Sequence, residues 1–332
     1  MSTLWEVTNF SLRTSAKDST ADSLYANGQM QVKVIVSIKA KIPDPDDGPA
    51  KDYTLTADEL KTIKLIYYDT RKELSGEWSY STTENDFAHV LPGGTAPAEP
   101  IADGTQAVIF WVSSTKLDHE NIAAQVSQPG KDEPTIIDTT GGSYHSMVTL
   151  VTLQPITYTT SNVSFTREDT AEGTWKKKTW SATWTYKWDQ DNYYLSSKFY
   201  PFLKVDRKKF VTNDDRFAYL RVDGSDISMF YMFNMGEEET VQRGITSTNV
   251  NTTLERRADI RINQQKNAFC LTRLRFFNGW SHWEPNWNQD AWFTIYDLYG
   301  NHGQFWVNTQ GQNTLSITSR NGSTSSGPTA KI

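Results

Sequence analysis

Residues 30–38, MQVKVIVSI, show the pattern that decides the fold of this chain. Positions 30, 32, 34, 36 and 38 are all apolar, whereas Gln31, Lys33 and Ser37 occupy the positions between them. This period of two is typical of a half-buried β-strand, because successive side chains of a strand point to opposite faces. Ala26, Asn27 and Gly28 just before it have the chemistry of a turn.

The rest of the chain is also dominated by strand signals. The best helix signal is a capping box, in which Thr56 precedes Glu59 by three residues, and it supports one short helix. Elsewhere, runs rich in Thr, Val, Ile and aromatic residues are broken by Gly, Pro, Asn and Asp, which predicts an all-β chain. Clear strand candidates are residues 64–68, 108–112, 122–126 and 147–153.

Two further stretches carry a family resemblance. Residues 24–28, LYANG, precede the alternating run, and residues 106–126 read QAVIFWVSSTKLDHENIAAQV. With them, residues 23–128 resemble bacterial immunoglobulin-like domains of the invasin and intimin type. The resemblance implies an immunoglobulin-like sandwich whose closing pair of strands lies in residues 106–126. The family's Asp-x-x-Gly-Asn-Pro step is replaced here by the longer PDPDDGPAKD of residues 43–52.

Composition changes in the second half, which holds nine of the twelve tryptophans. Residues 174–188, TWKKKTWSATWTYKW, predict an aromatic strand with Trp180, Trp184 and Trp188 in the core, although the same residues also fit a helical spacing. We therefore predict an immunoglobulin-like sandwich region over residues 1–160 and a Trp-rich, jelly-roll-like β-sandwich over residues 161–320. Residues 236–267 are polar and predict a long excursion or a hairpin, and residues 321–332 predict a disordered tail.

Charge, cysteine content and the N-terminus limit the possible roles. The net charge of −6 argues against a nucleic-acid partner, and the single cysteine excludes an intramolecular disulfide. The N-terminus lacks the pattern of a signal peptide, and no apolar run is long enough for a transmembrane helix. We expect synthesis in the cytoplasm, with release by lysis or by a dedicated secretion or injection system.

Motifs for catalysis and metal binding are lacking. The sequence has no nucleophile elbow, zinc-protease motif or phosphate-binding loop, and its five histidines lack the spacing of metal ligands. Cys270 lies in a strand pattern and is expected to be buried and inert. Asp44, Asp46 and Asp47 could bind calcium but read more readily as a solvated acidic loop. We predict a protein that is not an enzyme and has no cofactor or metal.

Residues 278–292, NGWSHWEPNWNQDAW, surround tryptophans with planar polar groups. Such a mixture predicts an aromatic platform for a sugar, in which indole faces pack on C–H groups and amides take the hydroxyls. The alternative is that these rings cap the open end of the sandwich core. The predicted ligand-binding residues are Trp280, His282, Trp283, Asn286, Trp287, Asn288, Asp290, Tyr299 and His302.

The function predicted from these patterns is recognition by a bacterial lectin-like or host-cell-binding effector. The expected partner is a glycan or a host-cell surface receptor, and the sequence sets no oligomeric state. One alternative is an insecticidal or cytolytic toxin acting on host membranes, in which residues 236–267 would refold. A second alternative is a structural protein that self-assembles through strand edges.

Overall fold

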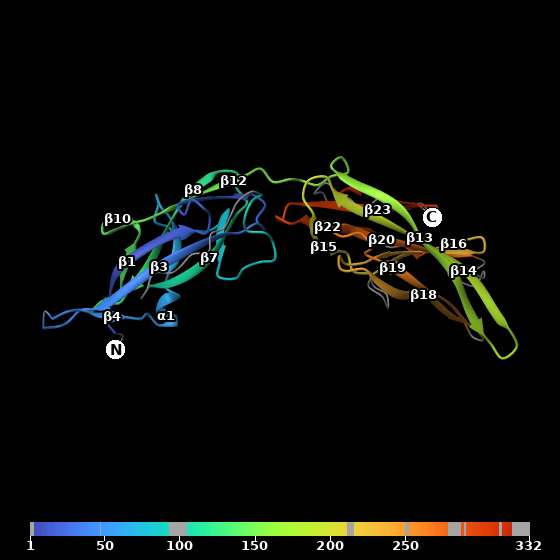
Figure 1. The fold of residues 1–332 in the computed structure, drawn as a ribbon, viewed down its shortest axis with the longest axis horizontal. Helices are drawn as coiled ribbons and strands as arrows, with labels where there is room; N and C mark the ends of the chain where they lie inside the picture. Colours follow the sequence, from blue (N-terminus) through green and yellow to red (C-terminus); the bar gives the residue numbers. More distant parts are fainter. Residues whose placement is uncertain are drawn as a thin grey trace. The chain divides into compact units, whose positions relative to one another are not determined.

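The computed structural model describes residues 3–46, 48–92, 105–210, 216–249, 252–277, 287–288, 290–311 and 314–320. Strands dominate this part of the chain, which confirms the all-β prediction (Figure 1). The chain divides into two compact units, one of residues 1–155 with 299–301 and one of residues 156–298 with 302–332. Among the described residues, no helix has the length and apolarity needed to cross a bilayer.

The first unit is built from two five-stranded sheets. One has the order β1 (Glu6–Thr14), β3 (Val32–Ile42), β7 (Gln106–Ser114) and β6 (Trp78–Ser81), with β4 (Lys51–Tyr53) beside β3. The other has the order β2 (Ala21–Tyr25), β12 (Val148–Leu153), β8 (His119–Gln128) and β5 (Lys64–Tyr67), with β9 (Thr135–Asp138) beside β8. A two-residue pair, β10 (Thr140–Gly141) and β11 (Tyr144–His145), is added.

This strand order is that of an immunoglobulin-like sandwich. The strands β1, β3, β7 and β6 correspond to A, B, E and D, whereas β12, β8 and β5 correspond to G, F and C. The expected closing pair is therefore wrong, because β7 and β8 belong to different sheets and β12 is the last strand. Sequence similarity over residues 106–126 could not reveal this, because a turn between two strands looks alike within a sheet and between sheets.

The alternating residues of β3 form the core of the first unit. Val34 and Val36 are fully buried, as are Leu65 and Ile122 of the other sheet. The predicted capping box is present at α1 (Ala57–Leu60), where the Thr56 amide donates to Glu59 at 2.7 Å. Burial opposes the charge of the Glu59 carboxylate, but hydrogen bonds, including one from the Trp5 indole at 2.7 Å, outweigh it and lower the pKa of Glu59.

The second unit is a sandwich of a six-stranded and a four-stranded sheet. The six-stranded sheet has the order β13 (Val163–Lys178), β14 (Thr183–Ser197), β20 (Phe269–Phe276), β17 (Asp226–Met232), β16 (Phe217–Asp223) and β21 (Trp287–Asn288). The four-stranded sheet has the order β15 (Phe202–Arg207), β22 (Ala291–Asp297), β23 (His302–Gln310) and β24 (Thr314–Ser319). Phe269, Phe293 and Phe305 pack at the centre of the core between them.

A third layer covers the opposite face of the six-stranded sheet. It is the hairpin of β18 (Glu239–Asn249) and β19 (Thr252–Ile262), which resolves the alternatives left open for residues 236–267. Ile260 and Ile262 of the hairpin are buried against this face. Cys270 of the sheet is buried in the same cluster. The side-chain amide of Gln190 bonds both the backbone N–H and the backbone carbonyl of Arg261, which ties the hairpin to β14.

The expectation of a core role for Trp180 and Trp184 is wrong. Trp180 is 99% exposed and Trp184 is 51% exposed, whereas Trp188 is partly buried against the hairpin side of the sheet. The reason is the register, because β14 pairs with β20 only from Trp188 to Leu195. Trp184 therefore lies where β14 has β13 as its only ladder partner, and Trp180 lies in the turn between β13 and β14.

We expect residues 1–160 to fold alone, because they contain every strand of the first sandwich. A single cooperative unfolding transition and a dispersed amide spectrum would support this. A chain of residues 1–140 is the matched control, since it lacks β12, which lies between β2 and β8. Loss of cooperativity in the longer chain would contradict the division near Thr160.

Truncation should distinguish exposed from buried aromatic residues. Phe293→Ala should cost about 3–5 kcal/mol of unfolding free energy, because Phe293 is fully buried between the sheets. Trp184→Ala should cost less than about 1 kcal/mol, because half of its side chain already contacts solvent. Urea denaturation measures both, and equal costs would show that Trp184 is part of a core.

Candidate functional site

The structure separates the residues predicted to bind a ligand. Trp280, His282, Trp283 and Asn286 lie outside the described residues, and Trp287 and Asn288 form β21, whose backbone pairs with β16. Asp290 is exposed immediately before β22, and His302 is exposed at the start of β23. Asp290 and His302 therefore lie at the four-stranded sheet, whereas Trp287 and Asn288 belong to the six-stranded one.

Tyr299 is unsuitable as a ligand contact. Only 7% of it is exposed, and its ring packs against that of Tyr25 with centroids 6.0 Å apart. Its backbone carbonyl accepts a hydrogen bond from the side chain of Asn27 at 2.9 Å. A ring this deeply buried offers a ligand little surface.

The outer face of the four-stranded sheet carries four aromatic side chains. Phe293, Ile295, Phe305 and Val307 alternate inward into the core, so the intervening residues of β22 and β23 point outward. We define the aromatic face as Trp292, Tyr296, His302 and Trp306. Trp292 lies opposite Trp306, and Tyr296 lies opposite His302, with the latter ring centroids 5.5 Å apart.

Polar groups lie between the two aromatic pairs. Thr294 and Gln304 are cross-strand partners midway between them, so the outer face reads aromatic, polar, aromatic along the strands. The aromatic pairs are four residues apart, which corresponds to about 13 Å along a strand. Beside Trp306, Asn308 donates to the hydroxyl of Thr318 at 3.3 Å. Thr294 is only 6% exposed, so a flat ligand would meet mainly the partly exposed Gln304 amide between the two aromatic pairs.

Two cations are held against these rings. The Arg320 guanidinium lies 4.4 Å from the centroid of Trp292 and 4.7 Å from that of Trp306. Lys204 of β15 lies 5.7 Å from the ring of Tyr296 and 3.7 Å from the Asp206 carboxylate. Such contacts between a cation and an aromatic ring are favourable and fix the position of the charge. Burial, followed by the nearby Asp206, raises the pKa of the Tyr296 hydroxyl.

The residues predicted from the sequence overlap this surface only in part. His302 and Asp290 were predicted, whereas Trp306, Gln304 and Arg320 were not. The available signal was the alternation of residues 302–310, HGQFWVNTQ, in which Phe305 and Trp306 are adjacent and must face opposite ways. What the pattern cannot show is which strands lie beside β23.

Other clusters in the described chain have structural explanations. Asp169, Asp189 and Asp191 bring carboxylate oxygens within 4.8 Å of one another, as a cation site would. However, Arg273 donates to Asp191 at 2.8 Å and to Asp189 at 2.7 Å, and Arg167 donates to Asp191 at 3.0 Å. These guanidinium groups already supply the positive charge that a metal ion would bring. We therefore interpret the three carboxylates as part of a buried ion-pair network.

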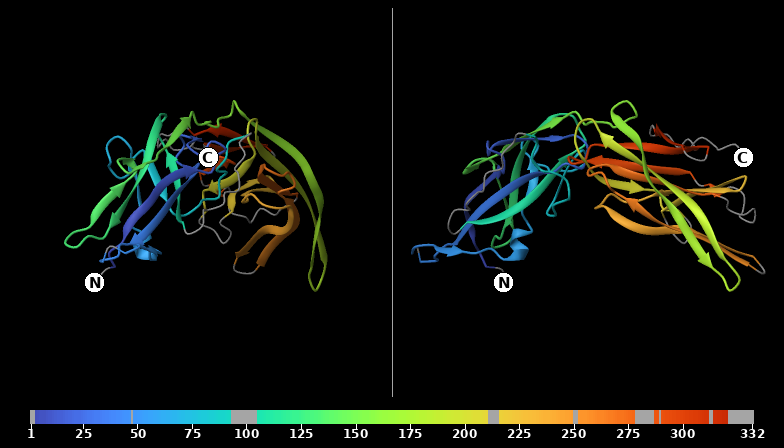
Figure 2. Two further views of the ribbon diagram at one scale, coloured as in Figure 1. Left: turned by 60° about the vertical axis from the view of Figure 1, so that its left-hand side comes forward. Right: turned by 45° about the vertical axis from the view of Figure 1, so that its right-hand side comes forward.

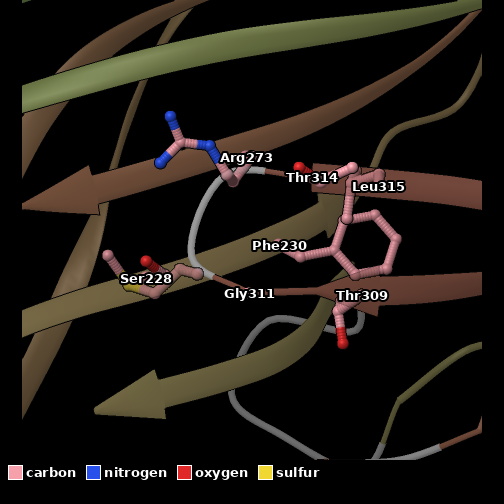
Figure 3. Close-up of a pocket in the computed structure, with 8 residues that line it drawn as sticks. Ser228, Phe230, Arg273, Thr309, Gly311, Thr314 and Leu315 are labelled. Atoms are coloured by element: carbon pink, nitrogen blue, oxygen red, sulfur yellow. The ribbon is translucent and has the colours of Figure 1, made fainter. Parts of the chain in front are cut away.

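The pocket beside this network is too small for a substrate. It lies between the two sheets, where Arg273, Ser228 and Phe230 meet Thr309, Gly311 and Leu315 (Figure 3). Arg273 and Ser228 each keep one buried polar atom without a hydrogen bond there. Its free space holds little more than one water molecule, which is the occupant that such groups usually retain.

A larger hollow lies on the first unit. It has a volume of about 430 Å³ and is lined by charges of both signs, including Asp69, Lys72, Glu77, Lys116 and Glu120. Its Trp78 is buried, and the hydroxyl of its Tyr67 is occupied by the carbonyl of Ser75 at 2.8 Å. The hollow is thus lined mainly by charges, whereas the aromatic face carries one exposed ring, His302, and three partly exposed ones.

Divalent metal should not stabilise the protein, because arginine already occupies the carboxylate cluster. Millimolar calcium, or EDTA, should shift the melting temperature by less than about one degree, since a bound ligand stabilises by mass action. Differential scanning fluorimetry measures this shift. A rise with calcium that Asp169→Asn abolishes would establish a metal site at the cluster, whereas one abolished by Asp44→Asn would place it in the acidic loop.

Comparison with known proteins gives no family. No family model matches the chain, and no curated protein matches it. The C-terminal domain of the antigen I/II polypeptide BspA of Streptococcus agalactiae is 10% identical with a TM-score of 0.20, over 94% of this chain and 100% of that one. The corresponding domain of AspA of Streptococcus pyogenes is 10% identical with a TM-score of 0.20, over 94% and 99%. Similarity at this level carries no argument for fold or function.

Proposed function

We propose that the protein is a non-enzymatic recognition protein that binds carbohydrate on a cell surface through the aromatic face. The single observation that supports this best is the order of the outer face, where the partly exposed Gln304 lies between two aromatic pairs, opposite the buried Thr294. Ligand sites are commonly apolar walls with a few well-placed polar groups. A sugar matches this pattern, because its ring has apolar C–H patches and its rim carries hydroxyls.

The rigid support of the aromatic face favours binding without a large ordering cost. Trp292 and Trp306 alternate with Phe293 and Phe305, which are fully buried in the core. Each outward ring therefore belongs to a strand whose backbone is fixed by the core packing of the neighbouring side chains. A preorganised surface keeps more of its contact energy as affinity than a flexible one.

The cations favour an acidic sugar over a neutral one. The guanidinium of Arg320 lies over both indoles, where its N–H groups can donate to a carboxylate or sulfate on a ligand above the face. Lys204 supplies a second charge near Tyr296, at the other aromatic pair. We therefore propose an oligosaccharide that carries uronate, sialate or sulfate groups and contacts both pairs.

The tryptophan-rich loop before the face remains part of this proposal. Asp290 directly precedes β22, and the tryptophan-rich residues 280–288 come just before it in the sequence. Together with His282, Asn286 and Asn288, these residues are proposed to extend the contact beyond the sheet. The toxin and self-assembly alternatives receive no comparable support from a described feature.

A glycan array and two variants test this proposal. The intact protein should bind acidic glycans. Trp306→Ala should weaken the best interaction roughly tenfold or more, because binding energy concentrates in aromatic residues at the centre of a site. Arg320→Gln should reduce the preference for acidic over neutral glycans while some binding remains.

Trp184→Ala is the matched control, because Trp184 is an exposed tryptophan of the same unit that lies on the other sheet. It should bind glycans like the intact protein, and a melting curve should show that each variant is folded. If no glycan binds, or if Trp306→Ala binds as well as Trp184→Ala, the aromatic face is not the binding site.

A further inference from the structure

A second aromatic surface lies at the free end of the hairpin of β13 and β14. We call residues 174–187 the ribbon, because they extend beyond Trp188, where the pairing of β14 with β20 ends. Figures 1 and 2 show this end of the hairpin projecting past the rest of its sheet, next to the β18–β19 hairpin. The ribbon contains four lysines and no acidic residue, although the whole chain has a net charge of −6.

The register sorts the ribbon into two different faces. Trp175 lies opposite Tyr186, and Lys177 lies opposite Trp184, so these four side chains share one face. The other face carries Lys176, Lys178 and Lys187 together with Thr174, Thr183 and Thr185. The lysines of this second face are all exposed.

The turn presents Trp180 to solvent while satisfying its own backbone. Trp180 is 99% exposed. Around it, the Thr179 amide donates to the Ala182 carbonyl at 2.8 Å, and the Ala182 amide donates to the Thr179 hydroxyl at 3.1 Å. The tip is thus a closed turn that leaves few free backbone groups to lose their water when a surface covers it.

The base of the ribbon is braced. The rings of Trp175 and Tyr186 stack with centroids 5.8 Å apart, and the guanidinium of Arg256 lies 3.3 Å from the centroid of Tyr186. The indole of Trp188 lies against Gly173, where any side chain would collide with it at 2.6 Å. The strands of the ribbon are therefore held by packing at their base, whereas the Trp180 side chain at the tip stays in solvent.

We propose that the ribbon attaches the protein to an anionic lipid surface, with Trp180 and Trp184 at the level of the headgroups. Tryptophan favours the membrane interface, because its ring is apolar and its N–H is polar. Lysines close to the membrane are attracted by anionic headgroups, and their long stems let the charge remain in water. A soluble polyanion would complement the charge of the lysines, but it would not explain the fully exposed indole of Trp180 at the tip. The contact is shallow, because the outer edge of β13 has unpaired backbone groups that cannot enter hydrocarbon.

Vesicle flotation with the full chain tests this attachment. The protein should float with phosphatidylcholine vesicles that contain phosphatidylserine and much less with phosphatidylcholine alone. Trp180→Ser should lower the vesicle affinity roughly tenfold or more, as expected for removing a large apolar contact. The pair Lys176→Gln and Lys178→Gln should lower it about twenty-fivefold, or about fivefold per lysine.

Matched controls separate the effect of the ribbon from that of exposed apolar and basic residues in general. Leu117→Ser removes an apolar side chain that is 56% exposed on the first unit, and the double variant Lys51→Gln, Lys266→Gln removes two exposed lysines elsewhere. Both variants should bind vesicles like the intact protein.

Equal flotation with both kinds of vesicle, or unchanged flotation of Trp180→Ser, would overturn the proposal. Retention on heparin without flotation would overturn it in favour of a soluble polyanion. Because Trp306→Ala should float normally, loss of glycan binding and loss of vesicle binding are distinguishable.

Discussion

The second unit depends on the burial of β14 and β20 on both of their faces. One face packs on the four-stranded sheet through Phe269 and Leu271, and the other lies beneath the β18–β19 hairpin. Gln190, Asp191 and Asn192 of β14 therefore cannot reach water and must be paired inside the protein. Asp191 is paired with arginines, and Gln190 bonds the backbone of the hairpin. Removing one partner of such a pair would leave a buried charge or amide unsatisfied, which is costly.

This layering also determines which aromatic side chains can contact a ligand or another surface. An aromatic residue on an inner face becomes core, as Phe293 and Phe305 do, whereas its neighbour in sequence is turned outward, as Trp292 and Trp306 are. Where the covering layers end, neither face is buried, and Trp180 and Trp184 stay exposed. The two proposed surfaces thus have one origin, since both carry aromatic residues that the layers leave uncovered.

Features that depend on near neighbours could be read from the sequence, and features that depend on distant strands could not. The alternation of residues 30–38 and the capping box at Thr56 appear in the structure because their signals lie within a few residues. Period two correctly placed Trp184 and Trp188 in one strand, but Trp180, which was predicted in the same strand, lies in the turn before it. The period could not show that β20 ends opposite Trp188, which is why the burial of Trp180 and Trp184 was wrongly predicted. The aromatic face was missed at Trp306 and Arg320 for the same reason.

The edge of the six-stranded sheet carries features that oppose pairing with another chain. An unpaired edge strand is a template for pairing with another chain. Strand β13 is such an edge, yet it carries Arg167, Glu168 and Asp169, and its register shifts between Asp169 and Ala171. Charges and bulges of this kind oppose edge-to-edge pairing. They disfavour self-assembly through β13, so the indoles of the ribbon stay available for a different partner.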